Sequence, residues 1–263
     1  MTTFSDLNHT GIWLAKSQAL INHQDFSESD LLASLSVSEL QKCQRIKHPL
    51  RQKEFLASRF FIQLLLNKYS NVIDQISITD LYATDTGRLV LKGQKTLYLS
   101  LSHSQGYLVL AISRSAIGVD IEYCRSHRVS PDAAELFMHN DELAHFKRLS
   151  SDQKVQFFYQ VWSAKEAYFK TLADDQQGPF TSQDFSLLPY LTQQKESVTQ
   201  TQDGNFWLLQ PTQLQQLFGD KTAMILSAFI PADSRTSYAT PKVSIWPEKH
   251  SAKKPSMVPL TIT

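Results

Sequence analysis

Apolar and acidic residues alternate over residues 117–122, where the sequence reads IGVDIE. Because successive side chains of a strand point to opposite faces, Ile117, Val119 and Ile121 would be buried while Asp120 and Glu122 would share the other face. Two carboxylates one pleat apart repel each other, so each prefers solvent, a proton or a cation as its neighbour. The pattern therefore predicts a strand with a paired acidic face.

A helical pattern follows about forty residues later, around WSAKEAYFK at 162–170. Apolar residues recur there at helical spacing, namely Val155, Tyr159, Trp162, Phe169 and Leu172. Glu166 occupies a position where this apolar face should continue, and Lys170 lies within its reach one turn further on. Alone, Glu166 and Lys170 fit an ordinary helix pair, and Asp120 and Glu122 fit a solvated strand end. Together, three acids and a lysine on apolar scaffolds predict a hard cation bound by oxygen ligands beside a phosphate group.

Elsewhere the pattern predicts an α+β protein in which helices are followed by strands twice. In the first half we expect a strand within 10–20, a strand over 76–82, and a hairpin of 97–103 with 107–112. Two helices are expected on either side of Pro49, over 36–48 and 51–69, and either Ser36 or Ser38 would be the N-cap of the first. The second half is expected to contain two helices within 135–172, with N-caps at Asn140 or Asp141 and at Ser151 or Asp152, and strands over 206–210 and 223–230.

The two halves predict subdomains at 1–114 and 115–230, followed by a C-terminal extension at 231–263. Five of the ten prolines lie in this last segment, mixed with Ser, Thr and Lys and without periodicity. Ile245 and Trp246 could pack back on the body, so an extended arm and a disordered tail both remain open.

Composition narrows the class of protein. The chain has 263 residues, of which 42% are hydrophobic, which is ample for a buried core. With a formal net charge of +1, the chain has no long-range electrostatic attraction for nucleic acid or for a membrane surface. Two cysteines, Cys43 and Cys124, are too few for a disulfide framework, and neither a leader nor a membrane-spanning run is visible. We therefore expect a cytoplasmic protein with no nucleic-acid or membrane partner.

Basic residues are concentrated around the helix predicted over 51–69. Between residues 42 and 68, Glu54 is the only acidic residue, against seven basic ones: Lys42, Arg45, Lys47, Arg51, Lys53, Arg59 and Lys68. The concentration predicts an anion-binding face, although an ordinary solvated face is the alternative for any single member. Arg59 shares the apolar side of the helix, so it must either reach solvent at an edge or pair with an acid.

The two motifs GVDIE and WSAKEAYFK together resemble the signature of the surfactin-type 4′-phosphopantetheinyl transferases. The second motif fits the family pattern of Trp or Phe, a small residue, any residue, Lys-Glu, a small residue, two more residues and Lys. The resemblance covers roughly residues 10–230. It implies a fold of two similar α+β subdomains related by a pseudo-twofold axis.

The resemblance also implies a reaction: Mg²⁺-dependent transfer of the 4′-phosphopantetheine group from coenzyme A to a serine of a carrier protein, with release of adenosine 3′,5′-bisphosphate. Asp120, Glu122 and Glu166 match the metal ligands, and Asp120 and Lys170 also match cofactor contacts. Either Glu166 or a metal-bound water would take the serine proton. Lys170 would stabilise charge on the pyrophosphate as the ester oxygen leaves.

Further cofactor contacts are implied at three segments that resemble those of the family. Arg51 begins RQKEFLASR, which resembles the segment that binds the 3′-phosphate end of coenzyme A. Gly87 and Arg88 resemble a Gly-Arg-Pro turn near the phosphates, although Leu89 replaces the proline. Ser102 and His103 lie in LSHS, where the family often has asparagine at the position of Ser100. A satisfied core histidine is the alternative for His103.

The implied partners are acyl or peptidyl carrier proteins of fatty-acid, polyketide, polyunsaturated-lipid or nonribosomal-peptide synthesis. In the family the carrier docks beside the segment that follows the acidic strand, here 123–146. That segment contains apolar and basic candidates for a groove: Arg125, Arg128, Phe137, Met138 and Phe146. Equally, the three apolar residues could face the core.

Three other protein classes compete with this interpretation. A different magnesium-dependent nucleotide phosphotransferase is disfavoured because no G-x-x-x-x-G-K-[ST] loop occurs among the eight glycines. A non-catalytic carrier-binding relative would be expected to lack one of the three acids or the lysine. The holo-acyl-carrier-protein synthase type is about half this length and trimeric. Because this chain carries both halves, we expect a monomer.

Overall fold

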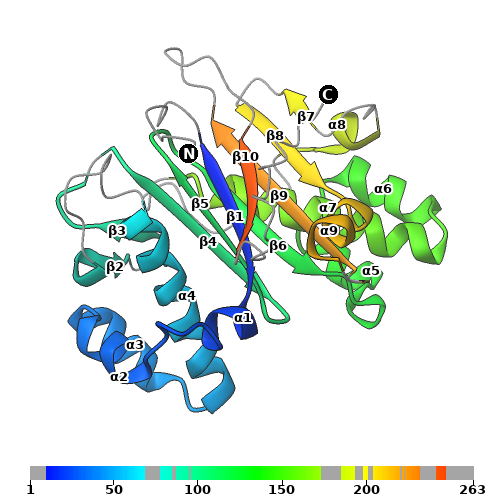
Figure 1. The fold of residues 1–263 in the computed structure, drawn as a ribbon. Helices are drawn as coiled ribbons and strands as arrows, with labels where there is room; N and C mark the ends of the chain where they lie inside the picture. Colours follow the sequence, from blue (N-terminus) through cyan, green and yellow to red (C-terminus); the bar gives the residue numbers. More distant parts are fainter. Residues whose placement is uncertain are drawn as a thin grey trace. The chain divides into compact units, whose positions relative to one another are not determined.

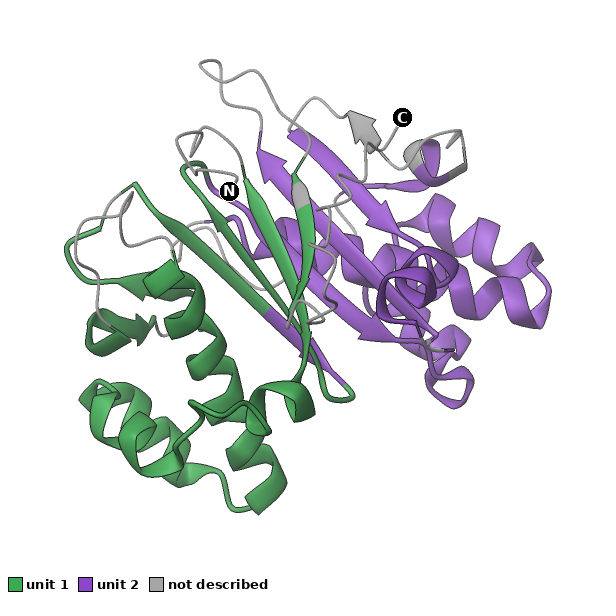
Figure 2. Cartoon of the chain, viewed as in Figure 1, with its two compact units in different colours: residues 1–101, 105–115, 239–260 green, residues 102–104, 116–238, 261–263 purple. Residues whose placement is uncertain are grey.

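The chain forms a mixed α+β structure in a computed structural model (Figure 1). The structure describes residues 10–68, 78–84, 87–94, 96–172, 185–192, 198–200, 204–219, 221, 223–231 and 241–246. Two compact units are present (Figure 2): unit 1 comprises 1–101, 105–115 and 239–260, and unit 2 comprises 102–104, 116–238 and 261–263. No helix in the described ranges is long and apolar enough to cross a membrane.

Unit 1 contains a four-stranded sheet in the order β10-β1-β5-β4. Its strands are β1 (Gly11–Lys16), β4 (Tyr98–Ser104), β5 (Tyr107–Ser113) and β10 (Lys242–Trp246). β1 is antiparallel to β5 and parallel to β10. A short 3-10 helix, η2 (Ile78–Asp80), leads into a separate pair of strands, β2 (Leu81–Ala83) and β3 (Leu89–Leu91). The predicted 97–103 and 107–112 hairpin is therefore present. Of the strand predicted over 76–82, residues 76 and 77 lie outside the described residues, 78–80 form η2, and only 81 and 82 lie in a strand.

Four helices complete unit 1: α1 (Ser17–Ile21), α2 (Glu28–Ser34), α3 (Val37–Arg45) and α4 (Pro49–Lys68). Of the two predicted N-caps, Ser36 rather than Ser38 caps α3, because its hydroxyl accepts from the Glu39 amide. That helix ends earlier than predicted, and Pro49 opens α4 rather than separating two helices. A proline fits the first turn because the amide that it lacks would have no partner there.

Part of the predicted anion-binding face is neutralised within unit 1. Arg59 forms a buried ion pair with Glu39, in which its Nε lies 2.5 Å from Glu39 Oε2. Burial lowers the pKa of Arg59, while the adjacent Glu39 carboxylate opposes that shift. Lys53 pairs with Glu28 at 3.0 Å on the surface. Of the two alternatives for Arg59, pairing with an acid is confirmed.

Of the two alternatives for the C-terminal segment, residues 242–246 follow the extended arm that packs back on the body. β10 pairs with β1 from Gly11↔Lys242 to Ala15↔Trp246, and Trp246 packs against the core of unit 1. The physical reason is that β1 is buried on nearly every residue and needs a partner strand on both of its edges. The prolines of 231–263 other than Pro231 and Pro241 lie outside the described residues.

Unit 2 contains an antiparallel sheet in the order β6-β9-β8-β7. Its strands are β6 (Gly118–Tyr123), β7 (Val198–Gln200), β8 (Gly204–Leu209) and β9 (Met224–Pro231). Its helices are α5 (Pro131–Glu135), α6 (Asn140–Arg148), α7 (Ser151–Phe169), α8 (Leu188–Thr192) and α9 (Pro211–Phe218), with a 3-10 turn, η3 (Ser126–Arg128). α7 packs on β6 and β9.

Both helices predicted within 135–172 are present, but each N-cap lies one residue before the earlier predicted position. His139 caps α6 and Ser150 caps α7, and each forms a capping box with the residue three positions later. In such a box the side chain at the third position returns a hydrogen bond to the cap amide, so the box determines where the helix begins. Asn140 and Ser151 are therefore the first helical residues rather than caps.

Candidate active site

The acidic strand and the WSAKEAYFK helix lie against each other within unit 2. A Cβ added to Gly118 on β6 would come within 1.7 Å of the Ala167 carbonyl oxygen of α7. Ser163 Oγ also donates to the Asp120 carbonyl at 3.1 Å. This close approach requires glycine at position 118 and places the C-terminal half of α7 beside the carboxylates of β6.

Asp120 is almost completely buried, with 3% of its surface exposed. Its Oδ1 accepts hydrogen bonds from Ser102 Oγ and from Lys170 Nζ, both at 2.8 Å. Its Oδ2 is buried and has no hydrogen-bond partner among the described residues. A buried carboxylate oxygen without a partner is unfavourable, so the atom is suited to a cation. The alternative of a solvated strand end is thereby excluded for Asp120.

Lys170 bonds to Asp120 rather than to Glu166, the helical neighbour that the sequence places within its reach. Besides Asp120, its Nζ donates to the Val119 carbonyl at 3.0 Å. Lys170 is the C-cap residue of α7, directly after Phe169. A side chain at this end can leave the helix and reach the adjacent strand, and α7 and β6 are in contact here.

Glu122 lies one pleat further along β6 and is held by two donors. Trp162 Nε1 donates to its Oε1 at 3.3 Å, and Ser104 Oγ donates to its Oε2 at 3.2 Å. Burial raises the pKa of Glu122, and the negative charge of Asp120 raises it further, while the two donors and Lys170 oppose the shift. The predicted repulsion between the two carboxylates is thus present in the fold.

Glu166 is half-buried on α7. Burial raises its pKa, the Lys170 ammonium opposes that shift, and the Asp120 carboxylate adds to it. The charge of Asp120 therefore raises the pKa values of both Glu122 and Glu166. The three acids and Lys170 form one electrostatic cluster, which we call the acidic cluster.

The acidic cluster fits a hard divalent cation in its chemistry. Its donors are carboxylate oxygens, its charge is not fully compensated, and one oxygen of Asp120 lacks a partner. Across the described part of the chain, no three His, Cys, Asp or Glu side chains are gathered tightly enough to form a ready metal centre.

The raised pKa values predict how stability depends on pH. Each native glutamate keeps its proton at pH values where an unfolded glutamate, with a pKa near 4.5, has lost it. The native state then binds more protons, so the stability contributed by Glu122 and Glu166 is present below pH 4.5 and is lost as pH rises through their native pKa values. Without Mg²⁺, Glu122→Gln should therefore raise the melting temperature near pH 7 and flatten its dependence on pH.

Thermal melts from about pH 4 to pH 7 would measure this effect. Glu135→Gln, at an exposed position of the same unit, is the matched control and should follow the wild-type curve. Added Mg²⁺ should stabilise the wild type more than Glu122→Gln. Parallel curves for the wild type and Glu122→Gln would contradict the proposed repulsion.

The remaining sequence-predicted residues lie in two places. Ser102 lies in the last three residues of β4, which belong to unit 2, and bonds to Asp120, whereas the adjacent His103 is exposed. Arg51 is exposed in the first turn of α4 in unit 1. Gly87, with φ +87°, and Arg88 form a turn before β3 in unit 1, where the Arg88 amide donates to Thr84 Oγ1 at 3.2 Å. Unit 2 alone therefore assembles Ser102, the three acids and Lys170.

Two residues of the acidic cluster's surroundings escaped prediction from the sequence. Ser104 falls between the two predicted strands of the hairpin, and the sequence places Trp162 only on the apolar face of a helix, yet both donate to Glu122. A signal for the serine exists, because Ser102 and Ser104 repeat with the same period of two as Asp120 and Glu122. Trp162 has no such signal, since an indole in an apolar stripe looks like any other core residue.

The predicted carrier groove does not involve the apolar residues named for it. Phe137, Met138 and Phe146 are at most 2% exposed and pack in the core of unit 2. Phe137 makes edge-to-face contacts with Phe158 and Trp162. The core alternative is therefore correct, because large aromatic side chains gain most when they are removed from water. Leu136, next to Phe137, is 76% exposed.

Comparison with known proteins shows which family this part of the chain resembles. Residues 116–224 match the family model described as the 4′-phosphopantetheinyl transferase superfamily. The protein is 30% identical over 149 residues to the 4′-phosphopantetheinyl transferase HetI of Nostoc sp., a match that covers 55% of this chain and 62% of HetI. It is 22% identical over 140 residues to the 4′-phosphopantetheinyl transferase Sfp of Bacillus subtilis, covering 53% of this chain and 60% of Sfp.

A further 4′-phosphopantetheinyl transferase of Bacillus subtilis is 25% identical over 143 residues, covering 54% of this chain and 62% of that protein. The matches thus span less than two thirds of the length of these relatives. They confirm the resemblance found in the two motifs, because 116–224 contains both. The resemblance is to the Sfp-type members of the superfamily.

Proposed function

We propose that the protein is a 4′-phosphopantetheinyl transferase, which moves the 4′-phosphopantetheine group of coenzyme A to a serine hydroxyl of an acyl or peptidyl carrier protein. The observation that carries this proposal is the acidic cluster. Asp120 is buried with one unpaired oxygen, Lys170 is bonded to its other oxygen, and Glu122 and Glu166 have raised pKa values beside it. The cluster lies wholly within the segment that matches the superfamily.

In the proposed reaction, the serine oxygen attacks the phosphorus that bears the pantetheine arm. A new bond forms between that oxygen and the phosphorus, and the phosphoanhydride bond breaks. Adenosine 3′,5′-bisphosphate leaves with the electron pair. Asp120, Glu122 and Glu166 would hold Mg²⁺, which when bound supplies positive charge to the pyrophosphate.

The protein's own side chains have separate roles in this step. Glu166 would accept the proton of the serine hydroxyl as the new bond to phosphorus forms. Lys170, held by Asp120 and the Val119 carbonyl, stabilises the charge that develops on the leaving phosphate. Ser102 and Ser104 hold Asp120 and Glu122 in place through their hydroxyl groups.

Arg51, Gly87, Arg88 and His103 are proposed contacts of the nucleotide end of coenzyme A. The exposure of Arg51, Gly87 and His103 and the positive charge of Arg51 and Arg88 support this role, which remains a prediction. We also propose that units 1 and 2 correspond to the two pseudo-twofold subdomains of the family and that the chain acts as a monomer. In support, each unit has a four-stranded sheet and one long helix, of 20 residues in α4 and 19 in α7.

Calorimetric titration with coenzyme A, with and without Mg²⁺, followed by a transfer assay with an apo carrier protein, tests the proposal. Binding should be tighter with Mg²⁺, and mass spectrometry should show one phosphopantetheine added to the carrier for each adenosine 3′,5′-bisphosphate released. A protein that binds coenzyme A but transfers nothing would be a non-catalytic relative. A protein that binds no coenzyme A in either condition would refute the proposal.

The carrier surface can be tested at Leu136, which is exposed in the segment expected to face the carrier. Burying a leucine side chain contributes about 1.5–3 kcal/mol, so Leu136→Ser should raise the KM for the carrier roughly tenfold or more. The KM for coenzyme A should not change. Steady-state kinetics with each substrate varied in turn would measure both values.

Two controls separate docking from folding. Phe137→Ser removes a buried side chain and should lower the melting temperature. Val37→Ser, at an equally exposed position of unit 1 (75%), should change neither KM nor stability. An unchanged carrier KM in Leu136→Ser would place the docking surface elsewhere.

A further inference from the structure

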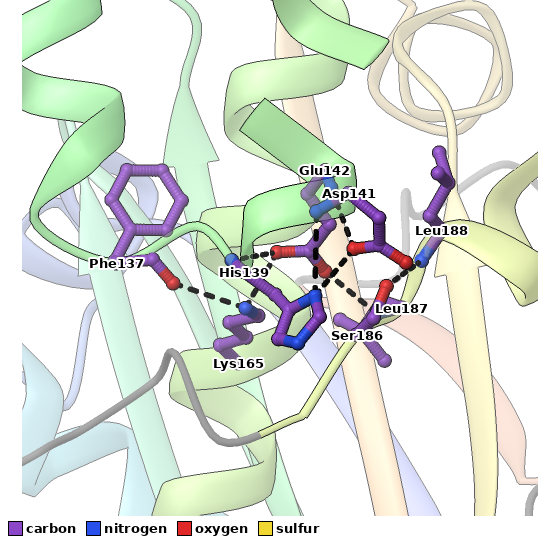
Figure 3. Close-up of polar contacts among 8 residues, drawn as sticks. All are labelled: Phe137, His139, Asp141, Glu142, Lys165, Ser186, Leu187 and Leu188. Carbon is purple, nitrogen blue, oxygen red and sulfur yellow. Dashed lines mark hydrogen bonds and ion pairs between the residues drawn. The ribbon is translucent and has the colours of Figure 1, made fainter. Parts of the chain in front are cut away.

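Lys165 and Glu142 form an ion pair that solvent does not reach, inside unit 2 (Figure 3). Both side chains are 0% exposed, and Lys165 Nζ lies 2.6 Å from Glu142 Oε2. Lys165 belongs to the WSAKEAYFK motif and directly precedes Glu166. The proposed chemistry gives neither Lys165 nor Glu142 a role.

The pair joins four segments of the chain at one point, as Figure 3 shows. Lys165 Nζ donates to the Phe137 carbonyl at 3.0 Å. Glu142 Oε2 also accepts from the His139 amide at 2.8 Å, and its Oε1 accepts from the Leu187 amide at 2.6 Å. The loop before α6, the first turn of α6, the segment before α8 and the C-terminal half of α7 are therefore held together by these two side chains.

Such a pair contributes little to net stability. Removing two charges from water is unfavourable, and the attraction between them inside the protein often does no more than offset that loss. In agreement, burial lowers the pKa of Lys165, and the charge of Glu142 opposes the shift. Two apolar side chains of similar size would stabilise the fold as well or better. The pair instead fixes the orientation of the segments that it joins, because its hydrogen bonds are satisfied in one arrangement only.

We propose that the Lys165–Glu142 pair is a positioning device that sets the rotation of α7 about its axis and thereby aims Glu166 and Lys170 at Asp120. This inference rests on the proposed function. Successive helix residues point about 100° apart, so holding Lys165 toward α6 determines where the side chain of Glu166 points. Lys170 lies four residues beyond Glu166, on the same side of the helix. Gly118 sets how closely α7 approaches β6, and the pair sets its rotation.

The test compares Lys165→Met, Glu142→Gln and the double variant Lys165→Met/Glu142→Gln. Lys165→Met leaves a buried carboxylate without its partner, so its melting temperature should fall. The double variant contains no buried charge, and its melting temperature should recover. Its kcat should nevertheless remain about 10–100-fold below that of the wild type, as is typical when the residues that orient a site are lost. Its KM for coenzyme A and its calorimetric affinity for coenzyme A with Mg²⁺ should change by a clearly smaller factor than its kcat.

Lys147→Met is the matched control, because Lys147 forms an exposed ion pair with Glu135 in the same unit. This variant should alter neither the melting temperature nor kcat. Glu142→Gln keeps an acceptor oxygen and should fold even if the double variant does not. Its kcat should also fall more than its KM for coenzyme A changes, but by a smaller factor than in the double variant. A double variant that regains both stability and kcat would overturn the inference, as would a loss of coenzyme A affinity equal to the loss of kcat. A wild type that transfers nothing would instead refute the proposed function, and the inference with it.

Discussion

Replacing Asp120 with Ala should lower kcat for phosphopantetheine transfer by roughly 10²–10³-fold, the loss expected when a central electrostatic group is removed. Asp120 binds Lys170 directly and influences both glutamates, so its loss disturbs every member of the acidic cluster. Folding should survive, because one of three mutually repelling acids is removed and Lys170 still donates to the Val119 carbonyl. Steady-state transfer at saturating coenzyme A and carrier, together with a thermal melt, would measure both effects.

Asp132→Ala is the control for this variant, since Asp132 is an exposed acid in the first turn of α5. It should retain the wild-type kcat. Glu166→Ala should lose activity as Asp120→Ala does, because Glu166 is both a proposed metal ligand and the proposed base. Near-normal turnover in either active-site variant would show that the acidic cluster is not where transfer takes place.

Gly118→Ala is expected to affect both folding and activity. The added methyl group would overlap the Ala167 carbonyl oxygen, and backbone on both sides prevents easy relief. Overpacking of this kind destabilises proteins by about 1–3 kcal/mol. If α7 moves away from β6 to make room, Glu166 and Lys170 move with it, so kcat should also fall. Urea unfolding and steady-state kinetics would report the two effects separately.

Gly93→Ala provides a contrasting control. Gly93 has φ +78°, and a Cβ there would meet no atom within 4 Å. Its replacement should therefore introduce only local backbone strain, of about 1–2 kcal/mol, without changing kcat. If Gly118→Ala were as stable and as active as the wild type, α7 and β6 could not be in the close contact described.

The acidic cluster and three of the proposed nucleotide contacts lie in different parts of the chain, and this affects how variants should be interpreted. The acidic cluster lies in unit 2, wholly within 116–224, and Ser102 and Ser104 of β4 also belong to unit 2, although they precede the matched segment. Arg51, Gly87 and Arg88 lie in unit 1. A unit 2 variant that loses activity but still binds coenzyme A would thus agree with separate roles for the two units.

Local patterns in the sequence determined the secondary structure around the site. The period of two over 117–122 placed Asp120 and Glu122 on one face of β6, and the apolar spacing near Trp162 identified α7. The two motifs also identified the Sfp-type resemblance, which the comparisons confirm. These features follow from residues that are close in the chain, so the sequence alone suffices to predict them.

Contacts between distant segments were decided only by the tertiary structure. Lys170 meets Asp120, fifty residues away, rather than Glu166, and Arg59 meets Glu39 on another helix. Phe137 faces the core while Leu136 beside it is exposed. In each case the partner depends on how one element packs on another, as α7 does on β6 at Gly118. Helical and strand periods specify which residues share a face, but the packing of whole elements specifies what that face meets.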